Sequence, residues 1–256
     1  MHRFSILVAI AGLIAIFSGA FVTSSKVALE PGQSVPSPDV HRIMGIAALV
    51  LALAFAVKAR SALRSAAWAA LAGLAASGAV AWNGAPSTAM VVVHASLAQF
   101  FAGSITAAIV LSSPAWSRAP EPVKAGQWTA LRPAALATPA VVFVQTILGA
   151  LYRHQITGVM PHMIGAMIVA LMTLVVSVMV LQNFSGHREL KNAATALISV
   201  ALAQICLGIA TFVMLLLEAA NTAAFVWIAT AHLAVGSLTL AASVAMAMGV
   251  SRNIVE

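Results

Sequence analysis

Long apolar runs separated by short polar segments extend along the whole chain. A helix that crosses a bilayer needs roughly 20 largely apolar residues, and the runs between charged residues have about that length. The uncharged run 65–117 is too long for one helix, and the turn-rich segment Asn83–Thr88 divides it into two. The pattern therefore predicts eight spanning helices, at residues 4–25, 43–57, the two parts of 65–117, 133–152, 162–182, 192–217 and about 225–249.

Composition supports this class. The chain is 62% hydrophobic and only 7% charged, whereas soluble domains carry about 25% charged residues. The cations behind the net charge of +7 lie between apolar runs, which is typical of topology signals and not of nucleic-acid binding. The single cysteine, Cys206, cannot form an internal disulfide. We expect an all-α integral protein of the cell membrane, with the lipid bilayer and no nucleic acid as partner.

The distribution of lysine and arginine predicts the topology. With the N-terminus inside, ten of the 13 cations fall on the cytoplasmic side, and eight spans place both termini there. A cleaved signal peptide is the alternative for the first run, which is long and has no clean small-x-small site after it. The inner cations are Arg3, Lys58, Arg60, Arg64, Arg118, Lys124, Arg132, Arg188, Lys191 and Arg252, and the outer ones are Lys26, Arg42 and Arg153.

An internal repeat divides the eight spans into two sets of four. "FSGAFVTSS" (Phe17–Ser25) ends the first span and "ILGALYRHQ" (Ile147–Gln155) ends the fifth. After an outer loop, each is followed by a histidine that opens the next span, His41 or His162. We therefore predict two tandem four-helix bundles of parallel topology. Their bounds are 1–117 for the first half, 118–131 for a cytoplasmic linker and 132–256 for the second half.

Four of the seven histidines fall on the even-numbered spans, and none falls on an odd-numbered span. His41 and His162 are expected at the outer ends, with His94 and His232 about 8–12 Å deeper. Each half thus offers one pair of imidazoles near the outer face. The other three histidines are expected outside the spans: His2 and His187, solvated in cytoplasmic flanks, and His154, in the second outer loop.

These histidines have two interpretations. A single ring at the membrane interface can serve as an amphipathic anchor, which applies best to His41 and His162, whereas polar groups deep in a span are usually functional. Two imidazoles that face each other suit the axial positions of haem iron. A zinc or non-haem iron site would lack ligands, and a proton relay would lack acids, because no carboxylate lies inside a predicted span.

Haem propionates at the outer face would need cations. Arg42 directly follows a proposed ligand and Arg153 ends the fifth span, so both are candidate propionate partners. Snorkelling of a long cationic side chain at a helix end is the competing interpretation for each.

Eight spans in two repeats, with a histidine on every even span, resemble the heme A synthase family over nearly the whole chain. This resemblance implies oxidation of a methyl group of haem O to the formyl group of haem A. It also implies that His162 and His232 hold a haem b, and that His41 and His94 frame the substrate haem. The segments that carry it are "VHRIMG" (Val40–Gly45), "VHASLA" (Val93–Ala98), "QTILGALYR" (Gln145–Arg153), "HMIGA" at His162, "QICLGIATFV" (Gln204–Val213) and "AHLAVGSLTL" (Ala231–Leu240).

The sequence departs from the family where a glutamate normally precedes the histidine of the second span. Pro38 occupies that position, and the adjacent Asp39 is the nearest candidate for a catalytic carboxylate. The resemblance further implies a haem O synthase or an electron donor as partner, and a second copy of the chain is another candidate. Two other functions stay open: a non-catalytic haem protein that carries electrons in the membrane, and a transporter without haem.

Overall fold

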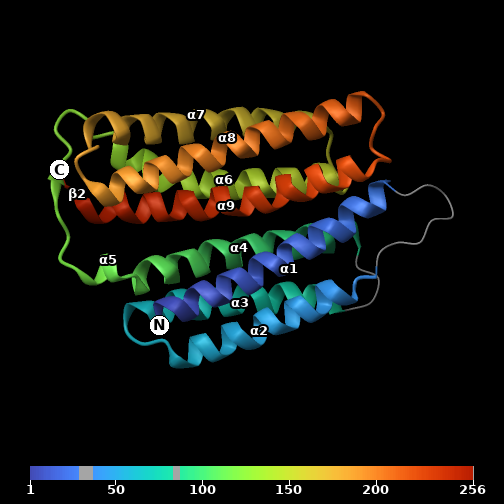
Figure 1. The fold of residues 1–256 in the computed structure, drawn as a ribbon, viewed down its shortest axis with the longest axis horizontal. Helices are drawn as coiled ribbons and strands as arrows, with labels where there is room; N and C mark the ends of the chain where they lie inside the picture. The colour runs from blue at the N-terminus through green and yellow to red at the C-terminus, as the bar shows by residue number, and fades with distance from the viewer. Residues whose placement is uncertain (29–36, 83–86, 256) are drawn as a thin grey trace.

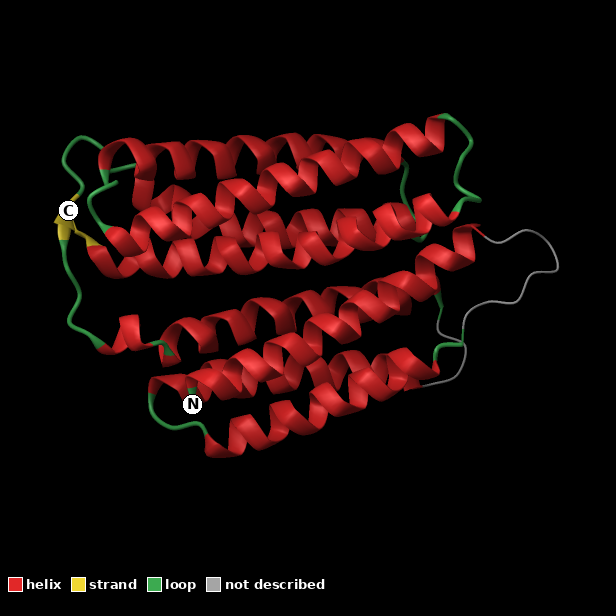
Figure 2. Cartoon of the chain, viewed as in Figure 1, coloured by secondary structure: helices red, strands yellow, loops and turns green. Residues whose placement is uncertain are grey.

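The computed structural model describes residues 1–28, 37–82 and 87–255, so most of the predicted turn Asn83–Thr88 lies outside the described residues. Helices make up almost all of the described part (Figure 2). Eight of them are long and apolar enough to cross a membrane, as the hydrophobic pattern predicts. They are α1 (His2–Ala28), α2 (Asp39–Lys58), α3 (Ala62–Trp82), α4 (Thr88–Ser112), α6 (Leu131–Arg153), α7 (Val159–Asn183), α8 (Arg188–Leu216) and α9 (Ala223–Asn253).

The helices extend a few residues beyond the predicted apolar runs. α2 begins at Asp39 and α8 begins at Arg188, because helical hydrogen bonding continues through the polar residues that flank each run. His187 precedes α8, and its Nδ1 accepts a hydrogen bond from the backbone N–H of Leu190. The expectation that His187 is solvated was therefore wrong: the side chain is buried and caps a helix.

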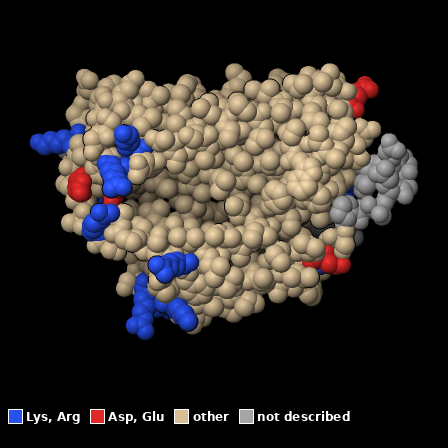
Figure 3. Space-filling view, in the orientation of Figure 1, with Lys and Arg blue, Asp and Glu red and all other residues tan. Residues whose placement is uncertain are grey.

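The long helices form two groups of four (Figure 1). In the first half, α1 and α3 each pack against α2 and α4, and in the second half α6 and α8 each pack against α7 and α9. The two halves meet along a seam where α9 contacts α1 and α4, and α4 contacts α6. Both chain termini lie at one end of the molecule, the terminal end, where Figure 3 shows most of the visible lysine and arginine side chains.

Each half has its own apolar cluster, and both clusters lie toward the terminal end. In the first half, the cluster includes Val8 early in α1 and Phe55 late in α2. In the second half, it includes Leu131 at the start of α6 and Val250 late in α9. The first residues of α2, α4, α7 and α9 lie at the opposite end of the molecule. This is the histidine end, because all four paired histidines are close to it.

Three short elements between and after the halves are not predicted by the hydrophobic pattern. α5 (Pro114–Ser117) follows α4, and β1 (Val123–Lys124) pairs in parallel with β2 (Ile254–Val255). The guanidinium of Arg252 stacks on Trp116 with its carbon 4.5 Å from the ring centre, which ties the end of α9 to α5. Strands of two residues are too short for a detectable period, and their pairing depends on a contact between distant parts of the chain.

Candidate functional site

The first histidine pair lies inside the first half. The ring centres of His41 on α2 and His94 on α4 are 6.0 Å apart, and the ring planes cross at 90°. Nδ1 of His41 lies 2.9 Å from the carbonyl oxygen of Ala15 on α1, and Nδ1 of His94 lies 2.9 Å from that of Ser77 on α3. A carbonyl can only accept, so Nδ1 carries the proton in both rings and Nε2 keeps a free lone pair.

The second half repeats this arrangement with one difference. The ring centres of His162 on α7 and His232 on α9 are 6.4 Å apart, and their planes cross at 88°. Nδ1 of His232 donates to the Gln204 carbonyl oxygen over 3.2 Å. At His162, the side-chain amide of Gln145 donates to the histidine's carbonyl oxygen over 2.8 Å, and its nitrogen lies 3.0 Å from Nδ1. Amide side chains therefore flank only the second pair.

The distance between the ring centres in both pairs is compatible with two histidines on one metal that takes its remaining ligands from a cofactor. Two imidazole nitrogens bound at about 2 Å on opposite sides of one metal ion place the ring centres roughly 6 Å apart. Within the described ranges, no group of three or more histidine, cysteine, aspartate or glutamate residues could hold a metal ion. Two nitrogens per site suit the axial positions of a haem, whose porphyrin supplies the other four.

Three of the four rings lie against a glycine of the preceding helix. A Cβ added at these glycines would stand only 2.7–3.0 Å from the Cε1 atom of the ring. Each glycine lies four residues after the residue that contacts Nδ1 of the same ring, through its backbone or its side chain. Residues four apart share a helix face, so a side chain in place of the glycine would cover the carbonyl of that earlier residue. The absence of a side chain thus lets the ring approach. The three contacts are Gly19 with His41, Gly149 with His162, and Gly208 with His232.

The hydrophobic pattern predicts no role for these glycines or for Gln145 and Gln204. Both glutamine side chains carry a buried Oε1 that has no hydrogen-bond partner among the described residues. The corresponding positions of the first half are Ala15 and Ser77, whose carbonyl oxygens contact Nδ1 of their histidines. The hydroxyl of Ser77 also lies 2.9 Å from Nδ1 of His94 and donates to the carbonyl oxygen of His94 over 3.1 Å. A glutamine four residues before a glycine occurs in both "QTILG" and "QICLG", and this spacing is the signal that identifies these positions.

The polar residues at the start of α2 contact one another. Arg42 forms an ion pair with Asp39, with NH1 3.4 Å from Oδ1, and both side chains are exposed. The hydroxyl of Ser37 also donates to the Asp39 carboxylate. The structure thus places the candidate catalytic carboxylate in a surface pair with Arg42, at the entrance to the first half.

Arg153 lies at the end of α6 and reaches into the seam between the halves. Its NH2 donates to the hydroxyl of Ser24 over 2.7 Å and to the carbonyl of Ala20 over 3.3 Å, both on α1. The second candidate propionate partner is therefore oriented toward the first half.

His154, directly after α6, has a pKa below its ordinary value of 6.5. Burial disfavours its charged form, and the positive charges of Arg153 and Lys26 disfavour it further. The unfolded chain therefore binds a proton more readily than the folded protein, so acidification below about pH 6.5 should destabilise the fold. Thermal unfolding of the detergent-solubilised protein between pH 7.5 and about pH 5 should show a smaller loss of melting temperature for His154→Gln than for the wild type. Equal losses would contradict this assignment.

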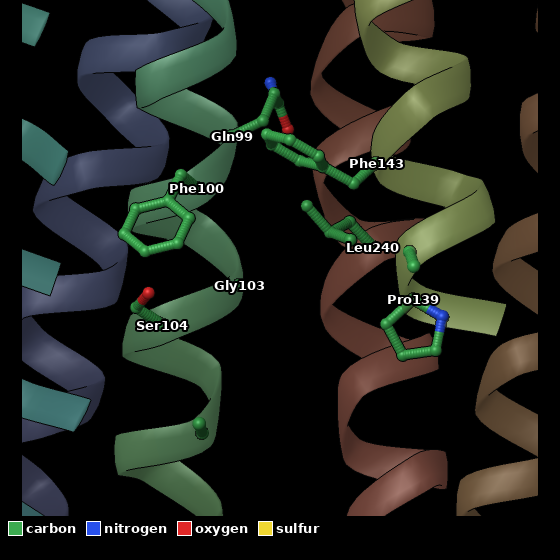
Figure 4. Close-up of a pocket in the computed structure, with 9 residues that line it drawn as sticks. Gln99, Phe100, Gly103, Ser104, Pro139, Phe143 and Leu240 are labelled. Atoms are coloured by element: carbon green, nitrogen blue, oxygen red, sulfur yellow. The ribbon is translucent and has the colours of Figure 1, made fainter. Parts of the chain in front are cut away.

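A cavity of about 360 Å³ lies in the seam between the two halves (Figure 4). It is bordered by α4, α6 and α9, and its lining is mostly apolar, with Phe100, Phe143 and Leu240 among the larger side chains. Gln99 also lines it and carries a buried Oε1 without a partner among the described residues. The cavity lining includes none of the four paired histidines.

Comparison with known proteins does not assign the chain to a family. No family model matches the sequence, and no curated protein matches it.

Proposed function

We propose that this chain is a membrane haem protein that oxidises a methyl group of haem O to the formyl group of haem A. The observation that carries the proposal is the geometry of the two histidine pairs, with ring centres 6.0 and 6.4 Å apart and planes near perpendicular. In this proposal His41 and His94 hold the substrate haem, and His162 and His232 hold a haem b that passes electrons. The resemblance to heme A synthases supports the assignment of these roles.

The protein crosses the cell membrane eight times, with both termini in the cytoplasm and both haem sites near the outer face. Ten of the 13 cations then lie on the cytoplasmic side, and Figure 3 supports this orientation because most visible cations gather at the terminal end. The halves 1–117 and 132–256 derive from a duplicated four-helix unit joined by the linker 118–131. Corresponding contacts between Nδ1 and a backbone carbonyl at three of the four histidines support the duplication.

The chain's own groups hold and orient the cofactor, and the iron of the bound haem supplies the oxidation chemistry. The carbonyls of Ala15, Ser77 and Gln204 would each keep the proton of a ring on Nδ1, which leaves Nε2 as the atom to bind the metal. At His232 the side-chain amide nitrogen of Gln204 lies 3.3 Å from Nε2 and would have to give way to the metal. Apolar packing near the terminal end holds the helices on which these residues lie. The membrane-embedded position excludes bulk water from the deeper side of each site.

A non-catalytic electron carrier on the same fold is the second candidate. The observation that favours it is the position of Asp39, whose carboxylate is exposed and paired with Arg42. Pro38 occupies the position at which the family normally carries a glutamate. A carrier would bind haem through the same four histidines and would leave the side chains of the porphyrin unchanged.

Expression in a host that makes haem O but no haem A separates these functions. We expect a reduced-minus-oxidised spectrum of low-spin haem in the purified protein, and extracted haem that contains the A type under oxygenated growth. Extracted haem that stays wholly of the O type would support the carrier. The absence of a Soret band after haem supplementation would exclude both haem functions and favour a transporter.

A further inference from the structure

The side chain of Arg153 leaves its own half and enters the seam beside α1. Besides its bonds to Ser24 and Ala20, it meets α9 indirectly, because Thr230 donates to the Ser24 hydroxyl over 3.2 Å. The side chains of Ser24 and Thr230 are fully buried. A guanidinium from the second half is therefore held by a polar group on the first, close to the histidine end.

Positive charge collects around Arg153 without an acidic partner among the described residues. The two ion pairs in the described ranges are Arg42 with Asp39 and Arg118 with Glu189, and neither includes Arg153. Nε of Arg153 is buried and has no hydrogen-bond partner there. Lys26 adds a second charge close enough to act on His154, as Arg153 does. A buried cation with a free donor favours an anion as neighbour.

The first half has no cation of its own at the corresponding position. Arg153 follows Gly149 by four residues in α6, and Thr23 follows Gly19 by four residues in α1. Thr23 is neutral and donates its hydroxyl hydrogen to the Gly19 carbonyl. Gly19 is also the residue against which the ring of His41 lies, so this turn of α1 belongs to the first histidine site.

We infer that Arg153, although encoded in the second half, binds a propionate carboxylate of the haem held by His41 and His94 in the first half. This inference rests on the proposed function and assigns one of its contacts. The bonds to Ser24 and Ala20 hold NH2 against α1, and Nε stays available to donate to a carboxylate oxygen. The second half thereby completes the haem site of the first half. Haem binding in the first half then depends on how the two halves pack against each other.

Two single-site proteins test the inference. His162→Ala leaves only the first pair, and His41→Ala leaves only the second. In the His162→Ala protein, Arg153→Gln should weaken haem binding roughly 10- to 100-fold, as expected for a lost charge-assisted hydrogen bond. The measurement is a titration of the Soret band with haem and with haem dimethyl ester, whose propionates carry no charge. Arg153→Gln should remove the preference for haem over its ester, and Arg153→Lys should restore part of it.

Arg64→Gln is the matched control, because it removes the same charge at the opposite end of the molecule. It should leave the affinity and the preference for haem over the ester unchanged. Equal weakening of haem and ester by Arg153→Gln would indicate a purely structural role and overturn the inference. So would an effect confined to the His41→Ala protein, or no effect at all. Failure of the proposed function is distinguishable. If the pairs bind no haem, the parent single-site proteins show no Soret band whatever residue stands at position 153; if only the oxidation fails, the effect of Arg153→Gln on haem affinity remains.

Discussion

Replacing His162 or His232 by alanine should abolish the low-spin haem b spectrum of the second half. Their ring centres lie 6.4 Å apart, which is compatible with one histidine on each side of the haem. Each alanine would therefore remove one of the two histidine ligands of the iron. Loss of groups that only support a ligand typically weakens metal binding 10- to 100-fold, so loss of the ligand itself should weaken it by roughly 100-fold or more. The measurements are the reduced-minus-oxidised difference spectrum and the haem content per protein, which should fall from two towards one.

His2→Ala is the control for this prediction. His2 begins α1 at the terminal end, and it belongs to neither pair. Added imidazole should restore a low-spin spectrum in His162→Ala, because it can occupy the space that the ring leaves. An unchanged spectrum in both His162→Ala and His232→Ala, together with a changed one in His2→Ala, would show that the pairs are not the haem ligands.

The eight spans could be predicted because lipid imposes a strong local rule on sequence. Every backbone polar group in a bilayer must be paired within the protein, so each crossing is a long apolar helix. The same rule sets no signal for the ends of the helices, which continue into polar residues such as Asp39 and Arg188. The pairing of Val123–Lys124 with Ile254–Val255 has no local signal in the sequence. The first strand lies in the linker before the second half, and the second strand follows the last helix, so the two are far apart in the chain.

The histidine pairs could be predicted from the sequence because polar rings are rare in apolar spans and these four histidines occur on every second span. The residues that hold the rings were not predicted from the same pattern. Gly19 and Gly208 look like ordinary small residues of packed helices, and only the approach of another helix shows what they accommodate. The path of Arg153 into the other half likewise depends on how the halves pack, which hydrophobic periodicity does not encode.

The glycine contacts lead to a second prediction of large effect. A Cβ at Gly208 would stand 2.9 Å from Cε1 of His232, and one at Gly19 would stand 2.7 Å from Cε1 of His41. Real Cβ atoms essentially never approach so closely, so the ring or the helix must shift. We expect the ring to move, which would lengthen its hydrogen bond to the backbone acceptor. Gly208→Ala should therefore weaken haem binding in the second half roughly 10- to 100-fold, and Gly19→Ala should do the same in the first half. Soret titration of the two single-site proteins measures each effect separately.

Stability should not follow haem affinity in these variants. Alanine is favoured over glycine in a helix by about 1 kcal/mol, so the helix itself gains from either change. The matched control is Gly78→Ala on α3, where an added Cβ meets nothing within 4 Å. That variant should keep its haem affinity and match or exceed the wild type in thermal stability without haem. If Gly208→Ala behaves like Gly78→Ala in both measurements, the close approach of the ring to α8 is not what positions His232. If Gly208→Ala loses affinity while the helices remain stable, the contact acts on the ligand and not on the fold.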